Sequence, residues 1–355
     1  MGGPSRYVAC LQRELRERGH DVRVVTTDGG TNAEVVSGFF ALVRHLRRWR
    51  PDVVHVHNSA RLLAVALLAR VARPKMRVLF TFHTQPVTRL FIPGLDTPQR
   101  DYGPVSSVLA RFLFRNSDLV TSVSESIVER HNAAYDLGIR RYLRIPSGAD
   151  PRAPRTSSTT PAFDGHPVLV SVGVMTWDWK VLGHLVAIRA VAELRRSYPR
   201  VLLLIAGDGP HRNVVEREVE SLDLGKHVRL LGNVAPDGLL DAADVYVHMA
   251  MNEGCSLAII EAMHAAKPIV AANAGGTPEV LVDGDSALLI EPEPGQLAAA
   301  VQKIVGDEPF AQRLAARARE VALQQYTWAV VADQYAATYR SLLAAESAPS
   351  GASAG

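Results

Sequence analysis

Short apolar runs alternate with longer amphipathic segments along almost the whole chain of 355 residues. The runs are rich in β-branched residues, which is typical of buried strands. They are Asp21–Thr26, Val53–His57, Val78–His83, Leu119–Val123, Tyr142–Ile145, Val168–Val174, Val201–Ala206, His227–Leu231, Asp244–His248, Ile269–Asn273 and Ala287–Ile290. Helical spacing of apolar positions marks Tyr7–Arg18, Phe39–Arg48, Leu62–Val71, Leu182–Tyr198, Val214–Leu222, Ser256–Ala266, Pro294–Val305 and Pro309–Gln325. This alternation predicts parallel sheets with helices on both faces.

The alternation stops once, between Asp150 and Pro167, where Pro, Ser and Thr are frequent. Such a composition is typical of a linker, and the pattern restarts after it. We therefore predict an α/β protein with two Rossmann-like, doubly wound domains, residues 1–150 and 166–326, which are joined by a linker at 151–165 and face a cleft. Residues 346–355, mainly Ser, Ala, Gly and Pro, are expected to form a disordered tail.

The first half departs from this pattern at its start. It opens on Gly2 and Gly3 and continues directly into a helix, whereas the first strand of a doubly wound domain normally lies at the sheet centre and leads into such a glycine loop. We hypothesise that the start is placed late, or that the chain is truncated, by one strand and its lead-in. Sequencing the N-terminus of the intact protein tests this; a native N-terminus at Met1 in an active protein would refute it.

Charge and cysteine content argue against several classes of protein. A net charge of +3 is too small to indicate a nucleic-acid partner. The cysteines, Cys10 and Cys255, are too few for a disulfide scaffold and fit a reducing cytosol. No run of about 18 apolar residues occurs, and the N-terminus lacks the apolar segment of a secretory signal. We therefore expect a cytoplasmic protein.

The run from Arg44 to Arg50 is strongly basic. We favour its interpretation as a solvated helix face that precedes a turn at Pro51. The alternative is a patch that contacts anionic lipid head groups, which would place the protein peripherally on the inner face of the membrane.

The stretch from Glu253 to Pro268 holds two carboxylates eight positions apart, Glu253 and Glu261. Buried-strand patterns precede and follow it, so it forms a strand–loop–helix–strand unit. Glu253 is predicted in the loop at the carboxyl end of a strand, where ligands bind in open α/β sheets, and Glu261 one to two turns into the helix. This arrangement suits a ligand that carries two separate sets of hydroxyls.

Seven stretches resemble, in their order and spacing, glycosyltransferase family 4, the retaining, nucleotide-sugar-dependent enzymes of the GT-B fold. They are Gly-His-Asp-Val-Arg-Val-Val-Thr (19–26), Pro-Asp-Val-Val-His-Val-His (51–57), Thr-Phe-His (81–83), Ser-Asp-Leu-Val-Thr-Ser-Val-Ser (117–124), the Glu253/Glu261 unit, Gly-Gly-Thr-Pro-Glu (275–279) and Tyr-Thr-Trp (326–328). The resemblance implies an acceptor-binding first domain, a nucleotide-sugar-binding second domain, and a last helix at about 327–344 that packs back on the first domain.

The resemblance also assigns the hydroxyl-binding residues of the donor site. Glu261 matches the helical glutamate that accepts hydrogen bonds from the ribose diol, a device shared with dinucleotide-binding folds, and Glu253 matches the glutamate that holds donor-sugar hydroxyls. The backbone amides of Gly254, Cys255, Ser256 and Leu257, at the helix N-terminus, would donate to the sugar or its phosphate. The alternative is that both acids are ordinary surface carboxylates.

When a nucleoside diphosphate leaves, negative charge develops on its phosphate oxygens, and cations and oriented amides must stabilise that charge. Lys180, expected in the loop after the strand that ends near Gly173, matches the family's phosphate lysine. The family's arginine directly after that glycine is Val174 here, and the glycine after the lysine is Val181. Arg212 is a candidate substitute, with a solvated loop residue as the alternative. Two further residues, Trp177 and Trp179, are expected to pack the loop rather than to stack on a ligand.

His83 ends a strand of the first domain and matches the family's histidine near the reaction centre; the alternative is a structural strand-end histidine. His55 and His57 are expected to face opposite sides of their strand, with His57 nearer the cleft, and so not to form a metal pair. Gly3, with Gly2, would leave room for the donor or cradle its phosphate. Gly275, Gly276 and Glu279 resemble the loop that abuts the nucleotide, and a tight turn explains them equally well.

We expect a metal-independent enzyme without a cofactor beyond its donor substrate. Asp283-Gly284-Asp285 matches the Asp-x-Asp pattern of a metal-binding motif, but its polar sequence context indicates a turn. In the resembling family the acceptor attacks from the face that the nucleotide leaves, and a phosphate oxygen helps take the proton. A carboxylate nucleophile is therefore not required.

The predicted function is transfer of a sugar from a nucleoside-diphosphate sugar to a glycan, lipid or small-molecule acceptor. The alternatives are a nucleotide-sugar epimerase of the same fold and a non-catalytic nucleotide-sugar-binding protein, the latter suggested by the absent arginine and first strand. The acceptor is expected to contact first-domain loops, above all Thr84–Gly103. Donor base, sugar, acceptor and oligomeric state stay open.

Overall fold

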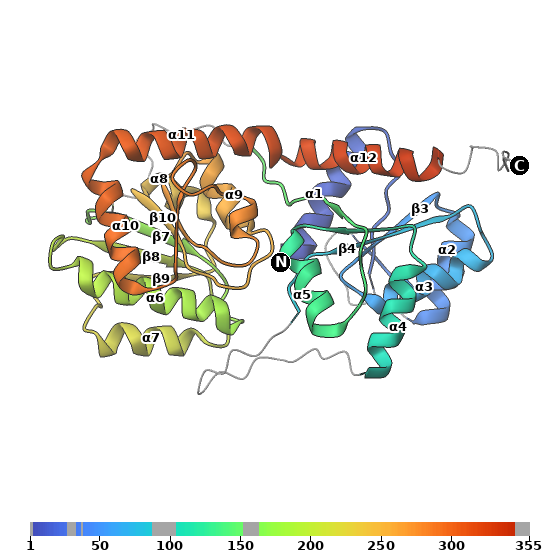
Figure 1. Cartoon of the computed structure of the whole chain (residues 1–355), viewed down its shortest axis with the longest axis horizontal. Helices are drawn as coiled ribbons and strands as arrows, with labels where there is room; N and C mark the ends of the chain where they lie inside the picture. Colours follow the sequence, from blue (N-terminus) through green and yellow to red (C-terminus); the bar gives the residue numbers. More distant parts are fainter. Residues whose placement is uncertain (1–2, 27–32, 37, 87–103, 152–162, 345–355) are drawn as a thin grey trace, which may run out of the picture. The chain divides into compact units, whose positions relative to one another are not determined.

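A computed structural model of the chain describes residues 3–26, 33–36, 38–86, 104–151 and 163–344. These residues form two compact units (Figure 1). The N-terminal unit holds the described residues up to Pro86, those of 101–148 and those from Trp328 onward, and the C-terminal unit holds those from Ala149 to Thr327. The predicted tail, Gly2 and most of the predicted linker lie outside the described residues.

The C-terminal unit is built on one parallel six-stranded sheet in the order β12-β11-β10-β7-β8-β9. Its strands are β7 (Val168–Val172), β8 (Leu202–Ala206), β9 (Val228–Gly232), β10 (Val245–His248), β11 (Ile269–Ala272) and β12 (Leu288–Ile290). Its helices are α6 (Asp178–Leu194), α7 (Arg212–Ser221), α8 (Pro236–Ala242), α9 (Leu257–His264), the 3₁₀ helix η1 (Thr277–Glu279), α10 (Pro294–Gly306) and α11 (Glu308–Gln325). This is the doubly wound order, and its strand order reverses between β7 and β10.

Alternate side chains of each strand enter different hydrophobic cores. Val168 and Val170 of β7 pack with residues of α8, α9 and α11, whereas Leu169 packs with residues of α6, α7 and α10. Because both sheet faces are covered, the strands are continuous apolar runs, as expected for a parallel sheet. That is why their positions are visible in the sequence to within one or two residues.

The N-terminal unit has the same construction but its sheet is in two parts. Strands β3 (Val53–His57), β4 (Arg77–Phe82), β5 (Leu119–Ser122) and β6 (Leu143–Arg144) form one sheet, and β1 (Val25–Thr26) pairs only with β2 (Glu34–Val35). In a doubly wound order the first strand lies between these two groups, and no strand of the described residues occupies that place. The strand predicted at Asp21–Thr26 is shorter in the structure: only Val25 and Thr26 form β1, since β1 pairs with β2 along two residues only.

Helices of this unit are α1 (Gly3–Glu17), α2 (Phe39–Trp49), α3 (Ala60–Val71), α4 (Pro104–Arg115), α5 (Glu125–Tyr135) and α12 (Trp328–Ala344). The last helix joins the unit through side chains of α1 and of Arg18, the residue after it. The Tyr7 hydroxyl donates to that of Tyr335 at 3.1 Å, and Arg18 pairs with Asp333 at 2.7 Å. Trp328, at the start of α12, is buried with its ring edge-on to Tyr7. None of the described helices is long and apolar enough to span a bilayer.

Three helices, α4, α5 and α8, are absent from the sequence prediction. α5 has a weak apolar stripe, since only Ile127, Val128 and His131 of its residues are buried. Its start carries a recognisable signal nonetheless: the Ser124 hydroxyl caps the helix by accepting from the Ile127 amide at 3.3 Å. Sequence reasoning based on periodicity alone overlooks such a helix.

Candidate active site

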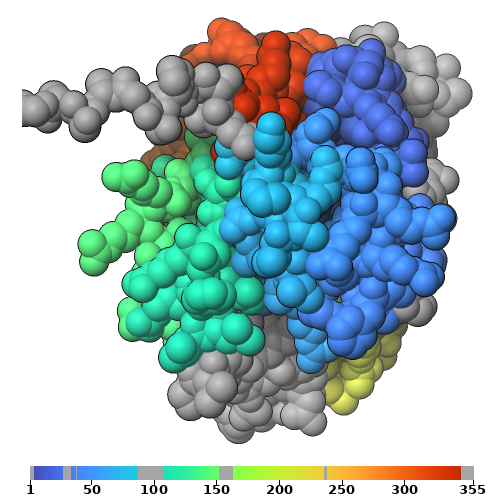
Figure 2. All heavy atoms as spheres, turned by 90° about the vertical axis from the view of Figure 1, so that its right-hand side faces the viewer, coloured from blue at the N-terminus to red at the C-terminus, as the bar shows by residue number. Residues whose placement is uncertain are grey.

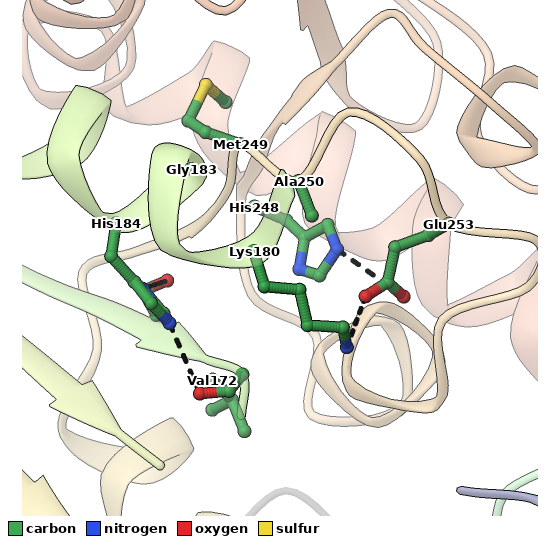
Figure 3. A pocket seen from close by; sticks show the side chains of 10 residues that line it. Val172, Lys180, Gly183, His184, His248, Met249, Ala250 and Glu253 are labelled. Carbon is green, nitrogen blue, oxygen red and sulfur yellow. Dashed lines mark hydrogen bonds and ion pairs between the residues drawn. The ribbon is translucent and has the colours of Figure 1, made fainter. Parts of the chain in front are cut away.

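A small pocket with several polar side chains in its wall lies at the point where the order of the C-terminal sheet reverses (Figure 3). Ser171, Val172 and Gly173 line it from the end of β7, while His248 and the loop after it line it from the end of β10. Residues of α6 complete the wall. Open α/β sheets bind ligands in this place, outside the carboxyl ends of the strands on either side of the switch point.

Glu253 lies in the loop between β10 and α9, as predicted, and its side chain is only 9% exposed. It forms an ion pair with Lys180, and Nε2 of His248 lies 3.8 Å from its Oε2 (Figure 3). Burial alone would raise the pKa of Glu253, but Lys180 and His248 lower it to about 2. Glu253 is therefore an ionised acceptor for hydroxyl donors.

Lys180 lies in the first turn of α6, not in the loop where it was predicted, because the helix begins at Asp178. The helix position fixes its direction toward Glu253 and makes it a close neighbour of His184, one turn later on the same face. Trp177 and Trp179 stack on each other with ring centroids 5.3 Å apart. The two indole rings therefore pack against each other at the start of α6.

His184 and His248 line the pocket and were missed by the sequence analysis. His184 Nε2 contacts the Gly173 carbonyl oxygen at 3.2 Å, which ties α6 to the end of β7. Burial lowers the pKa of His184 to about 4 and also lowers the pKa of His248, so both rings are neutral near pH 7. The four-residue spacing from Lys180 to His184 was an available signal; His248, inside a strand, offered none.

Two glycines allow the loops around the pocket to approach closely. A Cβ on Gly207 would lie 1.9 Å from the Gly173 carbonyl oxygen, and one on Gly275 would lie 2.5 Å from the Glu253 carbonyl oxygen; both have positive φ. The Gly276 amide donates to that same Glu253 oxygen at 2.8 Å. The Gly-Gly loop therefore braces the backbone of Glu253, and Glu279 lies in η1 just beyond it.

Glu261 is the fifth residue of α9, as predicted, and its charge contributes to raising the pKa of buried Tyr246, after the larger effect of burial. Ser256 takes the N-cap position, and its side chain hydrogen bonds to Glu253. Gly254, Cys255, Ser256 and Leu257 thus form the turn that links the loop carboxylate to the helix. The structure brings both predicted carboxylates to one loop–helix unit.

Arg212 is not among the residues that line this pocket in the described part of the chain. It begins α7, pairs with Glu216 at 2.7 Å and donates to the Leu230 carbonyl oxygen at 3.2 Å. Val174, which stands where the family has an arginine, is 41% exposed. Lys180 is the one basic side chain, apart from the histidines, that the described chain places in the pocket wall.

Asp283 and Asp285 have structural partners. The Leu289 amide donates to Asp283 at 2.9 Å, and Asp285 pairs with Arg317 at 3.0 Å. Gly284 has a positive φ between them, which is typical of a turn. The turn interpretation of this segment is confirmed.

In the N-terminal unit His83 follows β4 directly, and Nε2 of His83 lies 2.8 Å from Nδ1 of His57. The expectation that His55 and His57 face opposite sides is wrong: residues two apart on a strand share a face, and their ring centroids are 4.0 Å apart. Gly3 is the first residue of α1. The proposed acceptor loop from Thr84 to Gly103 lies mostly outside the described residues.

The fold is that of the GT-B glycosyltransferases. Anabaena HepE, solved in complex with UDP, matches with a TM-score of 0.79 at 21% identity over 96% of both chains. A glycosyltransferase from Rickettsia africae matches with the same TM-score at 19% identity, over 96% of this chain and 95% of that one.

The sequence matches narrow this class to a family. "Glycosyltransferase Family 4" matches residues 1–153 and "Glycosyl transferases group 1" matches residues 155–321. D-inositol 3-phosphate glycosyltransferase of Corynebacterium diphtheriae is 34% identical over 95% of this chain and 89% of that one. Phosphatidyl-myo-inositol mannosyltransferase of Mycolicibacterium smegmatis is 26% identical, over 96% and 90%. The chain belongs to the group 1, family 4 glycosyltransferases.

Proposed function

We propose that this enzyme transfers a sugar, with retention of configuration and without a metal ion, from a nucleoside-diphosphate sugar to a hydroxyl-bearing acceptor. The observation that carries the proposal is the pocket at the switch point, which combines a buried, ionised Glu253 with Lys180. The carboxylate suits sugar hydroxyls and the ammonium suits phosphate, so one pocket matches both halves of such a donor. Structurally similar HepE was solved with UDP, which supports the same donor class.

Within this proposal the residues divide the donor between them. Glu261 accepts hydrogen bonds from the ribose diol, Glu253 from the sugar, and Lys180 meets the charge that develops on the diphosphate as the bond to the anomeric carbon breaks. The amides at the start of α9 add donors at a helix N-terminus. The acceptor hydroxyl attacks on the face that the diphosphate leaves, and its proton passes to a phosphate oxygen. Lys180 stands without the family's usual arginine.

The experiment that tests the proposal begins with nucleotide sugars. Uridine, guanosine and adenosine diphosphate sugars are screened by thermal shift, and the donor that binds is incubated with acceptors. Because two relatives are named for inositol substrates, D-inositol 3-phosphate and phosphatidylinositol come first. Donor loss that requires the acceptor, product with the donor's anomeric configuration and activity unchanged by EDTA are expected. Release of epimerised sugar without acceptor would indicate an epimerase, and binding without donor loss a binding protein.

Glu261→Ala tests the ribose assignment. Loss of two hydrogen bonds to a carboxylate should weaken nucleotide diphosphate binding roughly 10- to 100-fold, as measured by calorimetry with the nucleotide that binds the wild type. Glu308→Ala, an exposed carboxylate in the first turn of α11, is the matched control and should leave the affinity unchanged. Unchanged affinity in Glu261→Ala would refute the assignment.

We also propose that α2 contacts anionic lipid. Arg44, Arg47 and Arg48 are exposed on this helix, and Phe40 at its start is 82% exposed. Figure 2 shows the face of the N-terminal unit on which α2 and α3 pack side by side. Sedimentation with phosphatidylglycerol vesicles, but not with phosphatidylcholine vesicles, is expected, together with its loss in Arg47→Glu/Arg48→Glu. Equal sedimentation with both lipids, or with neither, would refute the contact.

A further inference from the structure

Two histidines meet at the carboxyl ends of neighbouring strands in the N-terminal unit. His57 is the last residue of β3, and His83 follows the last residue of β4. Their rings are stacked with centroids 5.1 Å apart, and Nδ1 of His57 lies 2.8 Å from Nε2 of His83. This is a direct hydrogen bond between two imidazole rings.

Such a bond constrains where both rings carry their protons. One nitrogen must carry a hydrogen and the other must offer a lone pair, and a neutral imidazole has one of each. Burial lowers the pKa of His57 to about 4 and the pKa of His83 well below its usual value, so both rings are neutral near pH 7. The bond therefore occupies Nε2 of His83 and leaves Nδ1 as the nitrogen for any other partner.

We propose that His57 is the positioning residue of His83: it fixes the tautomer of that ring and directs Nδ1, not Nε2, to the reacting groups. The kinetic part of this inference rests on the proposed transferase function, since His83 is the residue that would meet the donor. The structural part stands on the hydrogen bond alone. In metal sites, partners that orient a histidine in this way contribute much of its function.

Two further contacts hold His83, one at its backbone and one at its ring. Its backbone amide donates to Oδ1 of Asn58 at 3.1 Å, and the side-chain amide of Asn58 donates to Oγ1 of Thr84 at 2.8 Å. Tyr7 lies edge-on to the His83 ring with centroids 4.5 Å apart. With the backbone and the ring held in this way, the bond to His57 is what distinguishes the two ring nitrogens of His83 among the described residues.

His55 provides a matched control. It lies on the same strand and face as His57, and burial lowers its pKa well below the usual value. Its ring bonds to Tyr339 at 2.7 Å and to Thr81, and not to His83. A change at His55 therefore disturbs the same buried cluster without touching the bond that carries the proposal.

The first test is ¹⁵N NMR of the wild-type protein labelled at histidine, which needs no activity. His83 should populate one tautomer, with a scalar coupling between its Nε2 and Nδ1 of His57. The proposal is supported if His83 carries its hydrogen on Nδ1 alone or on Nε2 alone and the coupling to Nδ1 of His57 is observed. A tautomer average at His83 without coupling overturns it, whatever the enzyme proves to transfer.

The second test compares variants of similar size. Asn places its amide near the position of Nδ1, whereas Gln places it near Nε2, so His57→Asn keeps a partner for His83 and His57→Gln does not. His57→Gln should lower kcat roughly 10- to 100-fold while donor KM changes little, and His57→Asn and His55→Asn should retain most activity. Equal losses in all three folded variants would indicate a structural role and overturn the proposal.

Discussion

At the scale of single residues, the Lys180–Glu253 pair links the donor pocket to stability. The pKa of Glu253 in the folded chain is about 2, below its ordinary 4.5, so its ionised form stabilises the fold above pH 4.5 and this stabilisation is lost as pH falls toward 2. Lys180→Met leaves a buried carboxylate without its ammonium partner, which should cost about 3 kcal/mol at neutral pH. The deficit should shrink on acidification, because Glu253 of the variant has lost the lysine that lowers its pKa, is left with the raising effect of burial, and takes up a proton at a higher pH than in the wild type.

Urea unfolding of both proteins at pH values between about 7 and 4 measures this difference. Lys226→Met is the control, since Lys226 is an exposed lysine of the same unit. A deficit for Lys180→Met that is constant across this pH range would contradict the assigned partnership.

At the scale of elements, the loop after β8 must pass close to the end of β7. Gly207 has φ of +143°, and its α-carbon faces the Gly173 carbonyl oxygen, which itself contacts His184. Gly207→Ala should force these loops apart, lower stability by about 1–3 kcal/mol and weaken donor binding at the pocket. Gly225→Ala, where a Cβ meets nothing within 4 Å, should do neither. Chemical denaturation measures the stability of the two variants, and calorimetry measures their affinity for the nucleotide. Equal stability and equal affinity in both variants would contradict the close approach of Gly207 to Gly173.

At the scale of the whole molecule, buried neutral histidines make the fold sensitive to acid. The pKa values of His57, His131 and His184 are about 4, and burial is the first cause in each case. Because the unfolded chain titrates near 6.5, it binds more protons between pH 6.5 and 4, so stability is full above 6.5 and falls as pH drops through this window. The expected slope is about 1.4 kcal/mol per pH unit for each histidine.

Thermal unfolding at pH values from about 7.5 to 5 measures the effect, and His184→Gln should reduce the slope. His20→Gln, at an exposed position in the N-terminal unit, should leave it unchanged. A melting temperature that is flat across this range would contradict the burial of these rings in neutral form.

Much of the site was visible in the sequence because it depends on local order. The spacing from Glu253 to Glu261 places one carboxylate in a loop and the other on a helix, and the structure confirms both positions. Lys180 was predicted in a loop because the helix was expected to start at Leu182, whereas α6 begins at Asp178 without a side-chain cap that the sequence could reveal. His184 could have been found from its four-residue spacing to Lys180 on α6. The place of His248 in the pocket and the His57–His83 bond were not predictable, since each involves residues from separate elements.

The sequence by itself determined the alternation of strands and helices, and with it the doubly wound fold, because burial on both sheet faces leaves a periodic apolar pattern in the chain. Only the tertiary structure decided that β7 and β10 are neighbours, and so that Lys180, His248 and Glu253 share one pocket. It also decided that the N-terminal sheet is in two parts among the described residues. Strand order is set by long-range pairing, which local periodicity does not encode.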